Sequence, residues 1–158
     1  MKIKALIVSI KGFKLSNKER TFLSKEKPWG LILFKRNILS INQLKKLTHE
    51  IKSLTKNKNF PILIDEEGPS VSRLNNIFNH STNANYFGKL FKKNKKISLT
   101  LYKFYLRSLC KNLKTIGINV NTIPVLDVLR KNTNKIIGNR SFSEKKEIVK
   151  KLGKITVR

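Results

Sequence analysis

The sequence predicts an α/β fold built on a parallel sheet, and two observations support this prediction. Short apolar runs alternate with longer amphipathic stretches along the 158 residues, and strand–helix alternation is the order that a parallel sheet requires. The short runs are continuously apolar, as expected for strands covered on both faces. A doubly wound sheet and part of an eight-stranded barrel both fit. About four strands are visible, whereas a closed barrel takes roughly 250 residues.

The strands are predicted from short apolar runs that stand next to turn signals. The run at 31–34 follows Pro28, Trp29 and Gly30, and proline and glycine are strong turn markers. The run at 61–64 is rich in β-branched residues, which favour strands. The predicted strands cover residues 5–10, 31–34, 61–64 and 120–123.

Three helices are predicted from apolar residues that recur at spacings of three and four. Ser40 and Ser143 are suited to cap the first and the third. Gly117 is suited to end the second, because glycine tolerates the left-handed conformation common at that position. Glu144 and Glu147 would lie near the positive end of the third helix. The predicted helices cover residues 41–54, 97–116 and 143–153.

The chain carries 35 Lys and Arg residues against 9 Asp and Glu, a net charge of +26. Such a charge attracts polyanions at low salt, which makes nucleic acid a candidate partner. The lysines are spread over the whole chain together with many Asn and Ile, and no nucleic-acid recognition motif accompanies them. We therefore interpret the charge as compositional bias and predict no specific nucleic-acid partner. A basic nucleic-acid-binding protein is the competing interpretation.

The N-terminal apolar run at 5–10 is interrupted at Lys11, lacks a cleavage site and is too short for a membrane span. We predict a cytoplasmic protein with no membrane association. The single cysteine, Cys110, excludes an internal disulfide, and its apolar neighbours at helical spacing predict that it is buried. Neither His49 nor His80 has a second His or Cys at metal-ligand spacing, so no metal and no cofactor are predicted.

Acidic residues gather where the third predicted strand ends. Asp65, Glu66 and Glu67 follow that strand directly, and function in parallel α/β folds collects at the carboxyl ends of strands. Carboxylates this close repel one another, so a cation is expected to share the site. Arg73 is the nearest candidate in the sequence. The competing interpretation is a surface turn in which Glu67 caps the next segment.

Two other strand ends carry charged residues. Lys35 and Arg36 suit an anionic or polar ligand, but an exposed polar turn explains them as well. Asp127 is interpreted as a structural carboxylate that accepts hydrogen bonds from backbone amides of its loop. Arg140 precedes a helix, where its guanidinium suits sugar hydroxyls, carboxylates or phosphates, although a lone loop arginine usually faces solvent.

Four segments together resemble the β-N-acetylhexosaminidases of glycoside hydrolase family 3. They occur in the family order with suitable spacings and cover nearly the whole chain. The resemblance implies a TIM barrel, of which residues 1–158 would form one partial N-terminal domain, an incomplete barrel of about four βα units. Residues 30–37 resemble G-x-I-L-F-x-R-N, residues 65–74 D-x-E-G-G-x-V-x-R-L, residues 121–128 N-x-x-P-V-L-D-V and residues 137–142 I-G-x-R-S-F.

The resemblance also implies an activity, the hydrolysis of terminal β-linked N-acetylglucosamine in the recycling of peptidoglycan muropeptides. The family's sugar-binding residues match Asp65, Arg73 and Arg140, and a carboxylate with arginine forks suits hydroxyl and acetamido groups. Pro69 stands where the family has a second glycine. Because proline fixes φ and lacks a backbone donor, we expect a reshaped loop there.

The same resemblance places the catalytic residues beyond Arg158. The family has a Lys-His sugar-binding pair, then a histidine acid/base and an aspartate nucleophile, and residues 1–158 contain none of these. A retaining glycosidase needs a nucleophile and a proton donor, so we expect these residues alone to be inactive. A catalytically inactive sugar-binding remnant is therefore a second interpretation. An unclosed barrel would also expose strand edges and apolar faces, which favour association.

Overall fold

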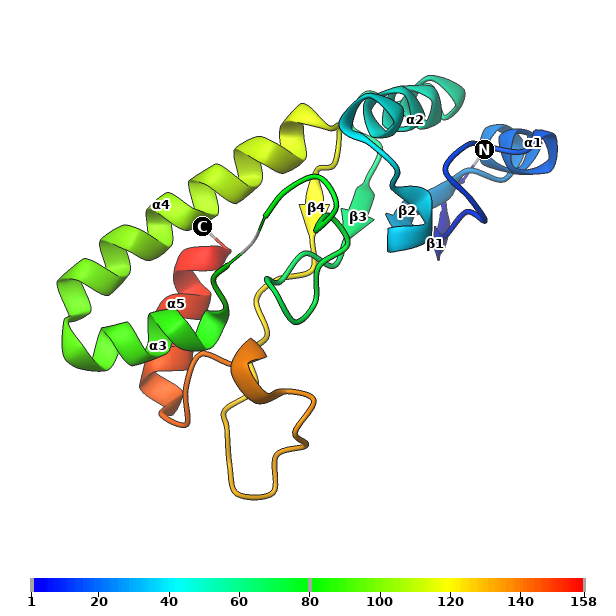
Figure 1. Ribbon diagram of the computed structural model, residues 1–158. Coiled ribbons are helices and arrows are strands. Elements are labelled where there is room, and N and C mark those ends of the chain that lie inside the picture. The colour runs from blue at the N-terminus through cyan, green and yellow to red at the C-terminus, as the bar shows by residue number, and fades with distance from the viewer. Residues whose placement is uncertain (1, 80, 158) are drawn as a thin grey trace. The chain divides into compact units, whose positions relative to one another are not determined.

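A computed structural model describes residues 2–79 and 81–157. The chain divides into two compact units: Met1–Glu66, Arg73–Asn79 and Cys110–Thr122 form the first, and Glu67–Ser72, His80–Leu109 and Ile123–Arg158 the second. The prediction of one partial domain stays a prediction. The elements (Figure 1) are β1 Lys4–Val8, α1 Asn17–Glu26, β2 Pro28–Leu33, η1 Lys35–Asn37, α2 Ile41–Leu54, β3 Ile62–Ile64, α3 Ala84–Lys93, α4 Lys95–Thr115, β4 Val120–Asn121, η2 Gly138–Arg140 and α5 Lys146–Thr156.

The first unit is built on a parallel sheet whose four strands lie in sequence order, β1-β2-β3-β4 (Figure 1). Leu31 of β2 lies opposite Ile62 of β3, and Ile64 of β3 lies opposite Asn121 of β4. Among the described strands, β1 and β4 each pair with one neighbour, so the sheet is open. The predicted parallel α/β sheet is confirmed, and the carboxyl ends of its strands lie along one edge.

Burial differs between the strands of this sheet. All of β3 is buried, as are Leu31 and Leu33 of β2. In β1, by contrast, Leu6 is 48% and Ile7 50% exposed. The prediction that the strands are covered on both faces is correct for β3 and wrong for β1, the strand at the edge.

Helix α2 has the bounds predicted from its periodicity, and Ser40 caps it by accepting a hydrogen bond from the Gln43 N–H at 3.2 Å. Gly117 follows α4 with a φ of +81°, as its predicted role requires. A Cβ there would lie 2.3 Å from Thr48 Oγ1. The Thr48 hydroxyl stands at this place because it donates a hydrogen bond to the Ile116 carbonyl at 2.9 Å. Close approach and backbone conformation therefore both favour glycine at 117.

The second unit has a core of its own. Aromatic and aliphatic side chains from α3, from α4 up to Leu109 and from α5 pack together, and Figure 1 shows α3 beside α5. Gly88 of α3 lies against the segment before α5, because a Cβ there would stand 1.7 Å from the Phe142 carbonyl oxygen. The buried members of this core are Phe87, Tyr102, Leu106, Phe142, Ile148, Val149 and Leu152.

Several local predictions are wrong. Helices α1 and α3 were not predicted, because α1 buries only Leu23 and α3 contains Gly88. The last helix begins at Lys146, with Lys145 rather than Ser143 at its N-cap. Cys110 is exposed, since the buried stripe of α4 runs through its neighbours and leaves the thiol on the other side.

Candidate functional site

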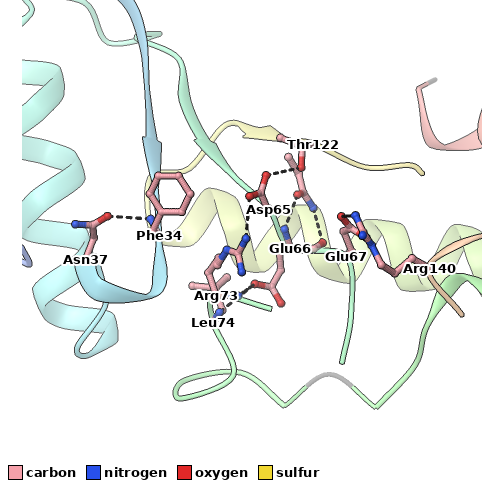
Figure 2. A network of polar contacts seen from close by, with 10 residues as sticks. Phe34, Asn37, Asp65, Glu66, Glu67, Arg73, Leu74, Thr122 and Arg140 are labelled. Carbon is pink, nitrogen blue, oxygen red and sulfur yellow. Dashed lines mark hydrogen bonds and ion pairs between the residues drawn. The ribbon is translucent and has the colours of Figure 1, made fainter. Parts of the chain in front are cut away.

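In the first unit, Asp65 forms an ion pair with Arg73, as predicted. Arg73 Nη2 lies 3.0 Å from Asp65 Oδ2. Thr122, which follows β4, donates its hydroxyl to Asp65 Oδ1 at 2.9 Å. Figure 2 shows Arg73 and Thr122 approaching Asp65 from different sides. The side chains of Arg73 and Asp65 are 29% and 24% exposed, so the pair stays accessible to a ligand.

Arg73 has donors beyond the one that Asp65 uses. Its guanidinium carbon lies 6.0 Å from the centre of the Phe34 ring, which follows β2. Among the described residues, Asp65 alone accepts a hydrogen bond from this guanidinium. Arginine has five N–H donors. Arg73 Nε is buried, so the donors that can still reach a polar ligand at the end of the sheet are those of the two Nη atoms.

The charged residues after β2 have a structural role. Arg36 donates through Nε to the Ile10 carbonyl at 3.1 Å and through Nη2 to Ser9 Oγ at 3.1 Å, and its guanidinium lies over Phe34. Lys35 is exposed. These contacts support the interpretation of Lys35 and Arg36 as a polar turn rather than a ligand site.

Asn37 holds this turn together and was not singled out by the sequence. It is completely buried. Its Nδ2 donates to the carbonyls of Ile10 at 3.0 Å and Gly12 at 2.8 Å, and its Oδ1 accepts from the Phe34 N–H at 2.8 Å. Asn37 closes the segment 30–37 that resembles the family pattern, and that position was the signal that could have identified it.

In the second unit, Arg140 and Glu67 form a two-pronged ion pair. Arg140 Nε lies 2.7 Å from Glu67 Oε2, and Nη2 lies 2.9 Å from Oε1 (Figure 2). Their side chains are 23% and 12% exposed. Paired hydrogen bonds of this kind fix the plane of the guanidinium. The interpretations of Glu67 as the cap of a surface turn and of Arg140 as a solvent-facing residue are therefore both wrong. The pairing of the two residues was not predicted.

The Glu67–Arg140 pair lines a small pocket in the second unit. Tyr105 and Pro124 are among its other walls, together with Phe87, Tyr102 and Phe142 of the core. Phenylalanine rings are apolar throughout, whereas tyrosine adds a hydroxyl at its tip. Arg140 is thus held beside a mainly aromatic wall.

Pro69 is accommodated without loss of a backbone hydrogen bond. Gly68 and Val71 bridge each other, with the Val71 N–H donating to the Gly68 carbonyl at 3.1 Å. Pro69 takes the second position of the turn between them, a position that proline favours and where no donor is needed. Gly68 has a φ of +135°, so it supplies the unusual backbone conformation.

Other predicted residues have no role in these clusters. The Asp127 carboxylate is exposed and has no partner among the described residues, while its backbone carbonyl accepts from Ser141 Oγ. The expected capping of loop amides by Asp127 is therefore wrong. His49 is exposed, and His80 lies outside the described residues.

The described ranges contain neither a group of side chains suited to a metal ion nor a helix suited to span a membrane. Across residues 2–79 and 81–157, no three His, Cys, Asp or Glu side chains are placed to share a metal ion. None of the helices described there combines the length and the apolar character that crossing a bilayer requires.

Asn121 and Thr122 are site residues that the sequence reading did not single out. Asn121 of β4 accepts from the Glu66 N–H through Oδ1 at 3.0 Å and donates through Nδ2 to the Glu66 carbonyl at 2.9 Å. Thr122 binds Asp65 as described above. Both stand at the carboxyl end of a predicted strand, and that position was the signal that could have identified them.

Comparison with known proteins places this geometry in a family. The chain is 33% identical over 157 residues to the Beta-hexosaminidase of Hydrogenovibrio crunogenus, which covers 99% of this chain and 43% of that protein. It is 34% identical over 147 residues to the Beta-hexosaminidase of Chromobacterium violaceum, covering 93% of this chain and 41% of that protein. The chain thus spans less than half the length of these curated relatives.

A solved structure has the same fold. NagZ from Neisseria gonorrhoeae, in complex with N-trifluoroacetyl-D-glucosamine, superimposes with a TM-score of 0.85 at 33% identity, over 98% of this chain and 46% of that one. The match confirms the fold as that of the N-terminal part of a TIM-type barrel. The family pattern described as "Glycosyl hydrolase family 3 N terminal domain" matches residues 1–158, and the chain therefore belongs to glycoside hydrolase family 3.

Proposed function

We propose that this chain supplies sugar-binding residues of a β-N-acetylhexosaminidase, which removes terminal β-linked N-acetylglucosamine. The observation that carries the proposal is the accessible Asp65–Arg73 pair at the carboxyl end of β3, joined by Thr122 from the end of β4. Active sites of barrel enzymes are built at this end of the strands. The names of the relatives, Beta-hexosaminidase and NagZ, support the reaction class.

The chemistry of the proposed ligands suits a sugar. Asp65 accepts hydrogen bonds from hydroxyl groups, and Arg73 has donors left for hydroxyl or acetamido oxygens. Arg140, in its own unit, is oriented by Glu67 through Nε and Nη2 and lies beside aromatic side chains. The solved NagZ structure named above contains an N-acylated glucosamine derivative, the class of ligand that we propose here.

The catalytic roles belong elsewhere in the proposal. Asp65 and Glu67 are paired with arginines, and Glu66 is completely buried. A retaining glycosidase needs a carboxylate nucleophile and a proton donor that both reach the sugar. We therefore assign neither role to these acids and propose that the nucleophile and the acid/base lie in a segment equivalent to the rest of the longer relatives. The setting that we propose is cytoplasmic peptidoglycan recycling.

The experiment that tests sugar binding is titration of N-acetylglucosamine into the 158-residue chain, observed by NMR. Arg73→Ala should weaken binding about tenfold or more, because a hydrogen bond to a charged group contributes about 1.5–3 kcal/mol. Arg20→Ala is the matched control. It removes the same charge from an exposed pair with Glu50 and should leave the affinity unchanged. Equal affinity of wild type and Arg73→Ala would contradict the proposed role of Arg73.

Hydrolysis is tested separately with a chromogenic N-acetylglucosaminide. The 158-residue chain alone should be inactive, whereas a fusion to the remaining part of the Hydrogenovibrio crunogenus protein should cleave the substrate. Turnover by the chain alone at an ordinary enzyme rate would contradict the assignment of the catalytic residues. Sugar binding combined with an inactive fusion would instead identify a sugar-binding remnant.

The net charge of +26 supports nucleic acid as a second candidate ligand. Phosphate contacts release counterions, so binding that rests on charge alone falls steeply with salt. We expect duplex binding to be lost by about 0.2 M salt, as for any strongly basic surface. Tight binding that persists at this salt concentration would favour the nucleic-acid alternative.

A further inference from the structure

Glu66 is a completely buried carboxylate for which the sugar-binding proposal gives no role. It stands between Asp65 and Glu67 in the sequence, but its side chain is directed away from solvent. Burying a charge is costly unless hydrogen bonds compensate it. A chain with only 9 acids against 35 bases nevertheless places one of them here, at the end of β3.

The Glu66 side chain accepts hydrogen bonds from two backbone groups of the returning chain. Its Oε2 accepts the Arg73 N–H at 2.8 Å and the Leu74 N–H at 3.0 Å (Figure 2). Leu74 is itself completely buried. One oxygen that accepts two consecutive N–H groups satisfies two buried backbone donors, which would be costly to leave without partners. The chain is therefore fixed at the residue that carries the guanidinium.

The backbone of Glu66 is fixed as well. The Asn121 side chain accepts from the Glu66 N–H at 3.0 Å and donates to the Glu66 carbonyl at 2.9 Å. These two bonds continue the pairing between β3 and β4 by one residue. The residue that binds the Arg73 backbone is thus hydrogen-bonded to the end of the sheet. The same two bonds also restrain Asp65, the preceding residue.

We propose that Glu66 is a positioning residue for Arg73. It fixes the backbone at position 73 so that the guanidinium meets Asp65 at 3.0 Å and keeps its other donors directed toward a sugar. Because Glu66 is completely buried, it acts through Arg73 and does not touch the ligand. This inference rests on the proposed function, since it concerns the same sugar-binding pair.

The test compares Glu66→Gln, Glu66→Asp and Glu66→Ala in the 158-residue chain by N-acetylglucosamine titration. Glutamine keeps an acceptor of the same length, so Glu66→Gln should bind the sugar within about threefold of wild type. Glu66→Asp keeps the charge but withdraws the acceptor by one methylene. It should lose about tenfold in affinity, as should Glu66→Ala. Rescue by Gln but not by Asp identifies the hydrogen-bond geometry, rather than the charge, as the cause.

Two controls separate positioning from general destabilisation. Thr48→Val removes a buried hydrogen bond of the same unit and should lower the melting temperature without changing sugar affinity. Glu50→Ala removes a partly exposed glutamate of the same unit and should lower the melting temperature only slightly, with no change in sugar affinity. Sugar affinity of Glu66→Asp equal to that of wild type would overturn the proposal, as would a loss of affinity in Thr48→Val that matches its loss of stability.

Amide hydrogen exchange supplies a readout that is independent of the sugar. The Arg73 and Leu74 amides should exchange slowly in wild type and Glu66→Gln, and markedly faster in Glu66→Asp. Equal exchange rates in all three proteins would overturn the positioning role even if Glu66→Ala did not fold. If wild type binds no sugar while the exchange pattern holds, the proposed function fails and the anchoring of Arg73 by Glu66 stands.

Discussion

Arg140 and Glu67 form an ion pair in which each residue's contribution to stability depends on the presence of the other. Both hydrogen bonds of the pair are short, and both side chains are largely withdrawn from solvent. Loss of one partner leaves the other charge poorly compensated, which costs more than the pair contributes to stability. In its exposure to solvent, the pair therefore lies between surface ion pairs, which contribute little to stability, and fully buried ion pairs.

A double-mutant cycle should measure this dependence. Arg140→Ala and Glu67→Gln should each lower the free energy of unfolding by about 1–3 kcal/mol, and the double variant should lose less than their sum. Urea unfolding measures all three changes. The exposed pair Arg20–Glu50 is the control, and its coupling energy should be under about 1 kcal/mol. Equal coupling in the two pairs would contradict the inferred difference.

The sequence predicted the candidate site unevenly at this scale. Arg73 was correctly paired with Asp65, because repulsion among adjacent acids demanded a cation and Arg73 was close in the chain. The partner of Glu67 was not predicted, because Arg140 is 73 residues away and no local pattern indicates so distant a contact. For the same reason, the sequence grouped Glu66 with its acidic neighbours and did not indicate that its side chain accepts hydrogen bonds from the backbone at Arg73 and Leu74.

At the scale of elements, a surface ion pair joins α3 to the segment that precedes α5. Lys92, in the last turn of α3, donates to both oxygens of Glu144 at 2.7 and 2.8 Å. Chiefly because of the hydrogen bonds from Lys92, the pKa of Glu144 is lowered to about 2. The pair is solvent-exposed, so its contribution to stability is small.

This lowered pKa fixes the pH range in which the pair contributes. A carboxyl with a depressed folded-state pKa stabilises the fold above its unfolded pKa of 4.5 and loses that effect as the pH falls toward about 2. Wild type should thus be slightly more stable than Glu144→Gln at pH 7, and the difference should vanish at the acid end. A Glu144 carboxyl that titrates near 4.5 by NMR would contradict the prediction.

The elements that the sequence predicted are those with strong periodicity or continuous apolar runs. Helix α2 was predicted to the residue, because its buried positions repeat at helical spacing. Helix α1 has one buried residue and α3 contains Gly88, so local pattern alone does not specify them. Gly88 is explained only by the Phe142 carbonyl, a tertiary contact. The exposure of β1 likewise depends on what packs beside it and not on its own composition.

At the scale of the whole molecule, we expect the exposed edge strand β1 to determine whether the chain associates with other copies. Leu6 and Ile7 leave an apolar surface exposed on this strand, and free strand edges favour pairing with other chains. The net charge of +26 opposes such contacts. Because 0.1 M salt largely screens the repulsion between exposed charges that are more than about 10 Å apart, association of the 158-residue chain should increase as salt is added.

Sedimentation velocity over a range of salt concentrations checks this expectation. Ile7→Lys should keep the chain monomeric under conditions in which wild type associates, because a charge at the edge strand discourages pairing. Phe104→Lys is the control, since it replaces an exposed apolar side chain on α4 and should leave association unchanged. Association of Ile7→Lys equal to that of wild type would exclude β1 as the contact.

Because most acidic residues of this chain have partners, we expect acidic and basic positions to differ in how well they tolerate mutation. Within the described residues, Asp127 and Glu147 are the exceptions among nine acids, and the others hold a cap, a partner charge or a backbone turn. Replacing an exposed lysine that has no acidic partner relieves repulsion. Replacing one of the seven other acids removes an ion pair or a backbone hydrogen bond. Substitutions that lower the net charge should therefore be tolerated at many lysine positions, whereas substitutions of these acids should be tolerated less well.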